Sequence, residues 1–118
     1  MNAHVDGTSF GRITIGGRVY THDVVLTPAG QVADRWTVLA NPAGSHVLAE
    51  EDAEYLAAQG APRVIVGTGQ YGALRLSEDA EACFRQHGCE VTLAPTPEAI
   101  ALYNATEGPV TALFHLTC

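Results

Sequence analysis

The most suggestive chemical motif in the chain is a run of closely spaced glycines that directly follows an apolar segment. Its spacing is that of a G-x-G-x-x-G loop, in which backbone amides and a helix N-terminus bind the pyrophosphate of a dinucleotide. Two other interpretations stay open: a tight turn whose glycines permit positive φ, and a loop whose exposed amides bind a smaller anion. The candidate ligand-binding residues are therefore Gly67, Thr68, Gly69, Gln70, Tyr71 and Gly72.

The residues around this loop argue against a dinucleotide site. A Rossmann loop continues directly into its helix, whereas residues 73–76 separate the last glycine from Ser77, the expected helix N-cap. The next strand should end in the acidic residue that binds the ribose, but it ends in Leu93, Ala94 and Pro95. We therefore expect no nicotinamide or flavin cofactor.

A second motif combines cysteine and histidine in a pattern that could bind a metal. Cys83, His87 and Cys89 form a C-x3-H-x-C cluster, to which His115 and Cys118 could add ligands. A structural zinc site needs four converging ligands, and the chain has no C-x-x-C pair to supply half of them. A small buried thiol and a histidine at a helix end explain the cluster without a metal, so we expect no metal site.

The remaining reactive side chains do not form an evident catalytic set. His115 and Cys118 lie three residues apart in an extended segment, so their side chains point to opposite faces unless the chain turns between them. His22 and Asp23 are neighbours on an expected strand and also face apart, and His46 has no visible partner. We predict that these groups point apart and that the chain has no catalytic residues. Thiol redox chemistry at Cys118 would require a depressed thiol pKa, which alkylation against pH would detect.

The composition restricts the classes of partner and compartment. The 118 residues include 13 acidic and 6 basic side chains, every base is arginine, and the formal net charge is −7. An acidic surface repels phosphate backbones, which disfavours a nucleic-acid partner. Neither a membrane-spanning apolar run nor the charged and apolar regions of a signal peptide are present. Three cysteines without close pairing are typical of reduced thiols, so we expect a cytoplasmic protein that does not bind membranes.

The first third of the chain indicates an antiparallel meander that follows a loose N-terminal end at residues 1–9. Alternating segments at 12–15 and 18–26 flank a Gly-Gly pair, which is typical of a hairpin turn because both positions can take positive φ. A second turn at 27–30 leads to a shorter strand that ends near Trp36.

The second half of the chain indicates alternating helices and strands. In order, we expect a helix at 50–59, a strand at 63–66, a helix at 77–87, a strand at 89–93, a helix with Thr96 as its N-cap, and a strand at 110–116. Acidic residues in the first turns and glycine or proline at the ends support the helices. The last strand is apolar on both alternating faces, which predicts a central position in the sheet. The β-α-β-α-β order predicts right-handed crossovers.

Three stretches of the sequence together resemble a known family. They are residues 18–26, residues 64–69 with Gly72, and residues 95–99 leading to Tyr103, Asn104 and residues 115–118. In order and spacing they are similar to a small domain family of unknown function, the Mth938-like domains. This family includes adipogenesis-associated proteins and a mitochondrial assembly factor for respiratory complex I.

The resemblance extends from about Phe10 onward and has consequences for fold and function. It implies a three-layer α/β fold with a mixed central sheet, no established catalytic residues, and a glycine loop unlike that of Rossmann proteins. No Arg-rich, Ser-rich transit segment precedes Phe10, so we do not expect the mitochondrial location to apply here.

Taken alone, the sequence predicts a single α/β domain at residues 10–118, an N-terminal meander followed by the β-α-β-α-β unit. The leading functional hypothesis is a non-catalytic binding or assembly domain that has a protein partner or forms a homo-oligomer. The alternative is a small-ligand protein or enzyme that binds an anion or metabolite at residues 67–72, with Tyr71 as one wall and Thr68 and Gln70 as polar contacts.

Overall fold

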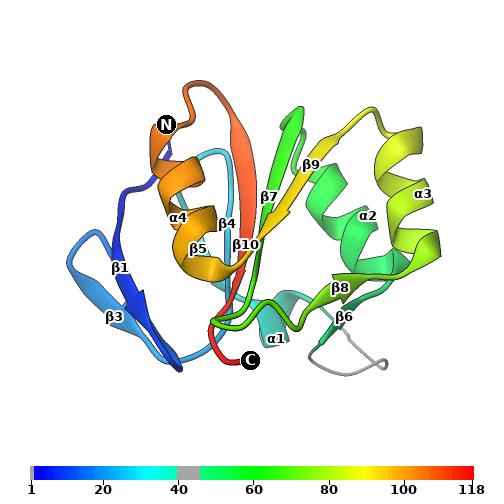
Figure 1. The fold of residues 1–118 in the computed structure, drawn as a ribbon. Helices are drawn as coiled ribbons and strands as arrows, with labels where there is room; N and C mark the ends of the chain where they lie inside the picture. The colour runs from blue at the N-terminus through cyan, green and yellow to red at the C-terminus, as the bar shows by residue number, and fades with distance from the viewer. Residues whose placement is uncertain (1, 40–45) are drawn as a thin grey trace.

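A mixed five-stranded sheet forms the middle layer of the molecule, with helices on both faces and a small hairpin sheet at one side (Figure 1). The computed structural model describes residues 2–39 and 46–118. The strand order in the central sheet is β5-β4-β10-β7-β9. This arrangement confirms the three-layer α/β fold with an N-terminal meander and a mixed sheet.

The C-terminal strand lies in the centre of the sheet, as its apolar faces predict. Strand β10 (Val110–His115) pairs in parallel with β7 (Arg63–Thr68) and antiparallel with β4 (Val24–Leu26). Beyond these, β7 pairs in parallel with β9 (Glu90–Ala94) and β4 pairs antiparallel with β5 (Val32–Asp34). All residues of β10 are buried, because helices or strands cover both of its faces. Strand β9 ends the sheet on one side.

Three helices cover the sheet. Helices α2 (Glu50–Ala58) and α3 (Glu78–Gln86) lie on one face and α4 (Thr96–Ala105) lies on the other (Figure 1). The hydroxyl of Ser77 accepts a hydrogen bond from the amide of Ala80 at 3.1 Å, which confirms the expected N-cap of α3. A short two-stranded parallel sheet, described next, lies beside α3.

This short sheet consists of β6 (Val47–Leu48) and β8 (Arg75–Leu76), which the sequence analysis did not predict. It inserts residues 73–76 between the glycine loop and α3, so the loop does not lead directly into a helix. In the described part of the chain, no helix combines the length and apolarity that crossing a membrane requires.

The central sheet separates two apolar cores. The core beneath α2 and α3 includes Val25, Leu56, Val66, Phe84 and Leu113. The opposite core includes Ile13, Ile65, Tyr103, Phe114 and Leu116. Each buried side chain of this size contributes about 1.5–3 kcal/mol, so the cores hold the sheet as a rigid support for the residues at its edges.

The N-terminal residues are part of the fold, which differs from the loose end expected at 1–9. Strand β1 (Val5–Ser9) pairs with β2 (Arg12–Ile15), which pairs with β3 (Arg18–Tyr20). The amide of Val5 donates to Oδ1 of Asn104 at 3.0 Å, and Nδ2 of Asn104 donates to the Val5 carbonyl at 2.8 Å. This partner on α4 is 99 residues away in sequence, so local patterns give no sign of it.

The continuous strand expected at 18–26 is wrong, because it is divided into β3 and β4, which belong to different sheets. The division falls at residues 21–23, where Asp23 turns a carboxylate inward. The expected strand near Trp36 also ends earlier, since Asp34 is the N-cap of a four-residue helix, α1 (Arg35–Val38), and accepts a hydrogen bond from the Trp36 amide at 2.8 Å.

Candidate functional site

The carboxyl ends of the parallel strands β7 and β10 bring the candidate residues together at one edge of the sheet. Thr68 and His115 are the last residues of these strands and pair directly with each other in the register. Open α/β sheets commonly place ligands at this edge. Two polar features lie here: a buried cluster of charged side chains and the glycine loop with its adjoining pocket.

The charged cluster joins Asp23, Arg35 and His115, and the sequence-based prediction that these groups point apart is wrong. Oδ2 of Asp23 accepts hydrogen bonds from Nη1 of Arg35 and from Nδ1 of His115, both at 2.7 Å. Oδ1 accepts a third from the Leu116 amide at 2.9 Å. All three side chains are buried, with Arg35 fully enclosed. A buried carboxylate with two charged or polar donors and one amide is fully satisfied.

The environment of Asp23 favours its ionised form. Burial by itself would raise the pKa of the carboxyl, but the hydrogen bonds from His115 and Leu116, the charge on His115 and the hydrogen bond from Arg35 together bring the pKa below its ordinary value. Asp23 is thus ionised at neutral pH, and its hydrogen bonds link the start of β4 to β10 and α1.

A second buried acid lies near the same arginine. Asp52 in the first turn of α2 has no exposed surface, and its Oδ2 accepts a hydrogen bond from the Ala49 amide at 2.9 Å. Burial raises the pKa of Asp52, and this effect outweighs the lowering by the Ala49 hydrogen bond and by the charge of Arg35. Arg35 also lies 4.3 Å from the ring centre of Trp36, a cation–π contact.

The cluster continues toward the C-terminus through the imidazole of His115. Nε2 of His115 lies 3.3 Å from the hydroxyl of Thr117, and the ring of His46 packs edge-on against that of His115 with centres 5.3 Å apart. The order carboxylate, imidazole, hydroxyl is that of a hydrolase triad. However, His115 is only 2% exposed, and such a reaction also needs amide donors for an oxyanion.

Those donors are not free in the neighbouring glycine loop, because each amide from residue 69 to residue 74 donates to an acceptor of the chain itself. The acceptors are Oγ1 of Thr96 for Gly69, and the carbonyls of Thr117, Cys118, Gly69, Cys118 and Thr68 for the next five amides in order. The C-terminal residues thus close over the loop, and no amide among these six remains for binding an anion or an oxyanion.

Thr96 fixes the position of this loop relative to the central strand. Its hydroxyl donates to the His115 carbonyl at 2.6 Å and accepts from the Gly69 amide at 2.9 Å. Thr96 is the first residue of α4, and the N-cap position is taken by Pro95. The expected cap is wrong because the hydroxyl serves this tertiary link instead of the helix amides.

The six candidate residues of the loop have separate roles. Thr68, Tyr71 and Gly72 line a pocket of about 520 Å³. The side chain of Gln70 points elsewhere and donates to Oγ1 of Thr8 at 3.1 Å. Gly67 and Gly69 have no space for a Cβ, which would lie 2.8 Å from the Phe114 ring in the first case and 2.6 Å from the Cys118 carbonyl oxygen in the second.

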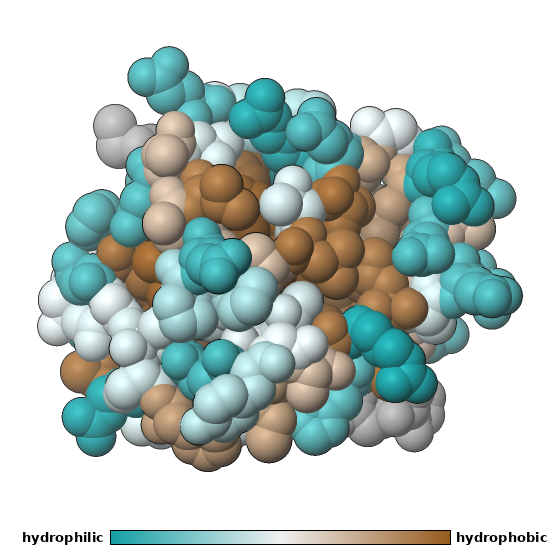
Figure 2. Space-filling view, viewed as in Figure 1, coloured by the Kyte–Doolittle hydropathy of each residue, from teal (hydrophilic) through white to brown (hydrophobic). Residues whose placement is uncertain are grey.

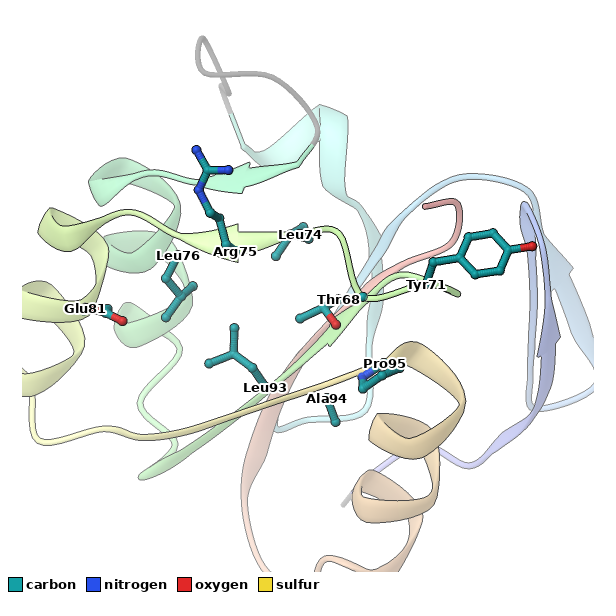
Figure 3. Close-up of a pocket in the computed structure, with 10 residues that line it drawn as sticks. Thr68, Tyr71, Leu74, Arg75, Leu76, Glu81, Leu93, Ala94 and Pro95 are labelled. Carbon is teal, nitrogen blue, oxygen red and sulfur yellow. The ribbon is translucent and has the colours of Figure 1, made fainter.

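The rest of the pocket comes from residues that sequence analysis missed. Its other lining residues are Leu74, Arg75, Leu76, Glu81, Leu93, Ala94 and Pro95. Figure 3 shows Thr68 in the middle of this set, between the β8 strand and the end of β9. The alternation of leucines at 74 and 76 was the available sign of a short strand, but nothing local indicated that it would face β9.

A second pocket extends the first along β9 toward α3. It has a volume of about 310 Å³ and shares Leu76, Glu81 and Leu93 with its neighbour, adding Phe84, Arg85, Cys89 and Val91. Together we call them the β9 groove. Figure 2 shows hydrophobic residues gathered on this face of the molecule, over β9 and toward α3. Leu93 is 43% exposed although it belongs to the sheet.

The cysteine–histidine cluster of α3 is held by short local contacts. Nδ1 of His87 lies 2.8 Å from the Cys83 carbonyl oxygen and 3.6 Å from its sulfur, whereas the Cys89 thiol points to the Ala61 carbonyl at 4.0 Å. Burial, and to a lesser extent the charges of nearby glutamates, raise the pKa of the Cys83 thiol. Within residues 2–39 and 46–118, no three His, Cys, Asp or Glu side chains converge as metal ligands.

The fold is that of a small α/β domain, and its glycine loop is closed by the residues that follow β10. The chain belongs to the family described as a protein of unknown function (DUF498/DUF598), which it matches over residues 5–115. The resemblance inferred from the sequence motifs is thereby confirmed.

Solved structures agree with this assignment. A conserved hypothetical protein from Pyrococcus horikoshii OT3 is similar at 29% identity and a TM-score of 0.86, covering 97% of this chain and 98% of that one. The protein named MT938 is 30% identical with a TM-score of 0.78, covering 99% and 100%. A Mth938-like domain of Bordetella pertussis shares the fold at 17% identity and a TM-score of 0.62, covering 97% and 85%. No curated protein matches the chain.

Proposed function

We propose that this chain is a non-catalytic binding domain that receives an extended segment of a partner protein along β9. The observation that carries the proposal is the β9 groove: the sheet ends at β9, and two adjoining pockets with both apolar and charged lining residues run beside this last strand. An edge strand offers a row of backbone donors and acceptors to an incoming strand.

The side chains on both faces of β9 fit strand addition. On the α3 side, Val91 and Leu93 line the groove. On the α4 side, Glu90 and Thr92 line a smaller hollow of about 100 Å³ together with Leu102. A segment paired to β9 would place alternate side chains over these two faces, because the side-chain period of a strand is two.

The state of the polar cluster supports a role without catalysis. The carboxylate of Asp23 is occupied by three donors, His115 is enclosed, and the loop amides nearby all bind the chain itself. A catalytic base has to reach the proton that it abstracts. We infer that these residues stabilise the part of the sheet that supports the groove.

We also propose the cytoplasm as the location and a protein as the partner. The three cysteines are free thiols, as expected in a reducing compartment. The net charge of −7 disfavours nucleic acid.

Photo-crosslinking in the native cell tests this function. We expect p-benzoylphenylalanine in place of Leu93 to give a discrete adduct with one protein, because this side chain lies in the groove and is exposed. The same replacement of Val19 is the matched control, since Val19 is 52% exposed but lies on β3, away from the groove. In the purified complex, Leu93→Lys should weaken binding roughly tenfold or more, because it brings a charge into an apolar contact.

Adducts of equal yield and identity from positions 93 and 19, or none from position 93, would contradict binding along β9. Unchanged affinity of Leu93→Lys for a captured partner would do the same.

A second candidate function is the binding of a small ligand, which was the alternative hypothesis from the sequence. It is favoured by the pocket at the glycine loop, whose volume lies within the range of small-molecule sites. A ligand at a hundred times its Kd would stabilise the fold by about 2.7 kcal/mol, which a thermal-shift screen of nucleotides and metabolites would detect. A screen in which no compound raises Tm would remove this candidate.

A further inference from the structure

Three backbone amides of the glycine loop converge on the two residues that follow Leu116. The Gln70 amide donates to the carbonyl of residue 117 at 2.7 Å. The amides of Tyr71 and Ala73 both donate to the Cys118 carbonyl oxygen, at 3.1 and 3.0 Å. Figure 1 shows the end of the chain beside the loop between β7 and β8. Amides that converge in this way form a backbone nest, which proteins use to bind anions and the carboxylate at the end of a peptide.

The backbone of the loop leaves room for this close approach. Gly69 has a φ of +106° and Gly72 a φ of +73°, conformations that L residues rarely adopt. A Cβ on Gly69 would lie 2.6 Å from the Cys118 carbonyl oxygen, so the missing side chain makes the space in which this oxygen lies. The loop thus has both the donors and the space for an acceptor, and the chain's own residues fill that space in this structure.

The firm anchoring of this end of the chain stops at Leu116. Strand β10 ends at His115, and Leu116 is 1% exposed with its carbonyl accepting from the Gly11 amide at 2.8 Å. Thr117 is half-buried and its hydroxyl lies 3.3 Å from Nε2 of His115, whereas Cys118 is exposed. Releasing these last two residues would break the three loop hydrogen bonds and the hydroxyl contact, while the pairing of β10 stays intact.

Release would expose a polar site beside His115. Nδ1 of His115 is 2.7 Å from the Asp23 carboxylate, and Nε2 is left directed at the position of the Thr117 hydroxyl. A hydroxyl can both donate and accept, so it fits Nε2 in any protonation state of the ring. The site therefore favours serine or threonine as the last but one residue of a ligand, with the carbonyl of that residue at the Gln70 amide.

We propose that residues 117–118 occupy in cis a binding site for the carboxyl-terminal end of a partner protein, and that their release opens it. The terminal carboxylate of the partner accepts from the Tyr71 and Ala73 amides, and hydrogen bonds to a charged acceptor are among the stronger ones. The closed state lowers the apparent affinity in proportion to the fraction of open molecules. This inference goes beyond strand addition along β9, since neither the loop amides nor His115 belongs to that strand.

Short capped peptides test the site without knowledge of the partner. The probes are N-acetyl-threonylserine with a free carboxylate, its carboxamide, and N-acetyl-valylserine, each titrated into the ¹⁵N-labelled full-length chain. We expect the first probe to shift the amides of Gln70, Tyr71 and Ala73 in a saturable way. It should also lower the ¹H–¹⁵N NOE of the Cys118 amide, because the residue is released when the probe binds. The other two probes should bind more weakly by roughly threefold or more, since each lacks one of the recognised groups.

Substitutions at Thr117 separate an autoinhibitory role from a structural one. Thr117→Val removes the hydroxyl contact with His115 from the closed state. It should tighten the binding of N-acetyl-threonylserine by roughly three- to tenfold, the factor for one neutral hydrogen bond. A purely structural contact would give no such gain. Thr117→Ser keeps the hydroxyl and Cys118→Ser changes an exposed side chain, so both controls should leave the affinity unchanged.

Four results would overturn the inference. The first is that N-acetyl-threonylserine shifts none of the three loop amides in the native chain or in Thr117→Val. The second is equal affinity of these two chains for the probe. The third is equal affinity of the native chain for the probe and its carboxamide, which would remove the terminal carboxylate as the recognised group. The fourth is a Cys118 amide that stays rigid while the probe is bound.

Discussion

Asp23→Asn is expected to lower the free energy of unfolding by about 3–5 kcal/mol at neutral pH, the usual effect of removing one member of a buried ion pair. The native carboxylate accepts hydrogen bonds from Arg35 and His115 through the same oxygen. The asparagine amide has no negative charge and can offer only one acceptor oxygen, so the buried guanidinium loses its counter-charge. Urea unfolding followed by circular dichroism would measure the change. Glu107→Gln, an exposed carboxyl, is the control and should stay within about 0.5 kcal/mol.

The pH dependence of this difference follows from the sign of the pKa shift. Because the folded pKa of Asp23 lies below its ordinary value of 3.8, the ionised carboxylate contributes stability above pH 3.8, and this contribution is lost as pH falls through the folded pKa. The difference between the native chain and Asp23→Asn should therefore be constant near neutral pH and shrink below about pH 4. A difference that is as large at pH 2.5 as at pH 7, or one below 1 kcal/mol at pH 7, would contradict the role given to Asp23.

The helices and buried strands of the second half could be predicted because their determinants are local. Ser77 precedes two acids and caps α3, and the apolar run that begins at Arg63 forms β7. Residues 110–116 are apolar on both alternating faces, and this correctly placed β10 in the centre of the sheet. Such features depend on neighbours within one or two turns, which the sequence displays directly.

The site could not be predicted to the same extent, since it depends on pairs that are distant in the chain. Asp23 and His115 are 92 residues apart, and both stand in segments that otherwise look like ordinary strands. The pocket forms between β8 and β9, which do not pair with each other. The glycine loop drew attention to the right edge of the sheet, but its amides are used internally, and this depends on where the C-terminal residues fold back.

Gly69→Ala is expected to be the most damaging substitution in the glycine loop, with a loss of about 3 kcal/mol or more from backbone strain and displaced packing together. Gly69 has a φ of +106°, which L residues rarely adopt, and its added Cβ would lie 2.6 Å from the Cys118 carbonyl oxygen and 2.9 Å from the His115 ring. A side-chain rotation cannot relieve the clash with Cys118, because the atom that the Cβ meets there belongs to the backbone. The C-terminal residues should therefore move away from the loop.

The consequence for the loop can be measured separately from global stability. The amides of Gln70, Tyr71 and Ala73 donate to carbonyls of Thr117 and Cys118, so their hydrogen-exchange protection should fall selectively in Gly69→Ala. Gly88→Ala is the matched control: its φ is +68° and no atom lies within 4 Å of the added Cβ. That variant bears only the conformational cost, about 1–2 kcal/mol. If the two variants lose equal stability and the loop amides stay protected in Gly69→Ala, the C-terminal closure of the glycine loop is not what holds this edge of the sheet together.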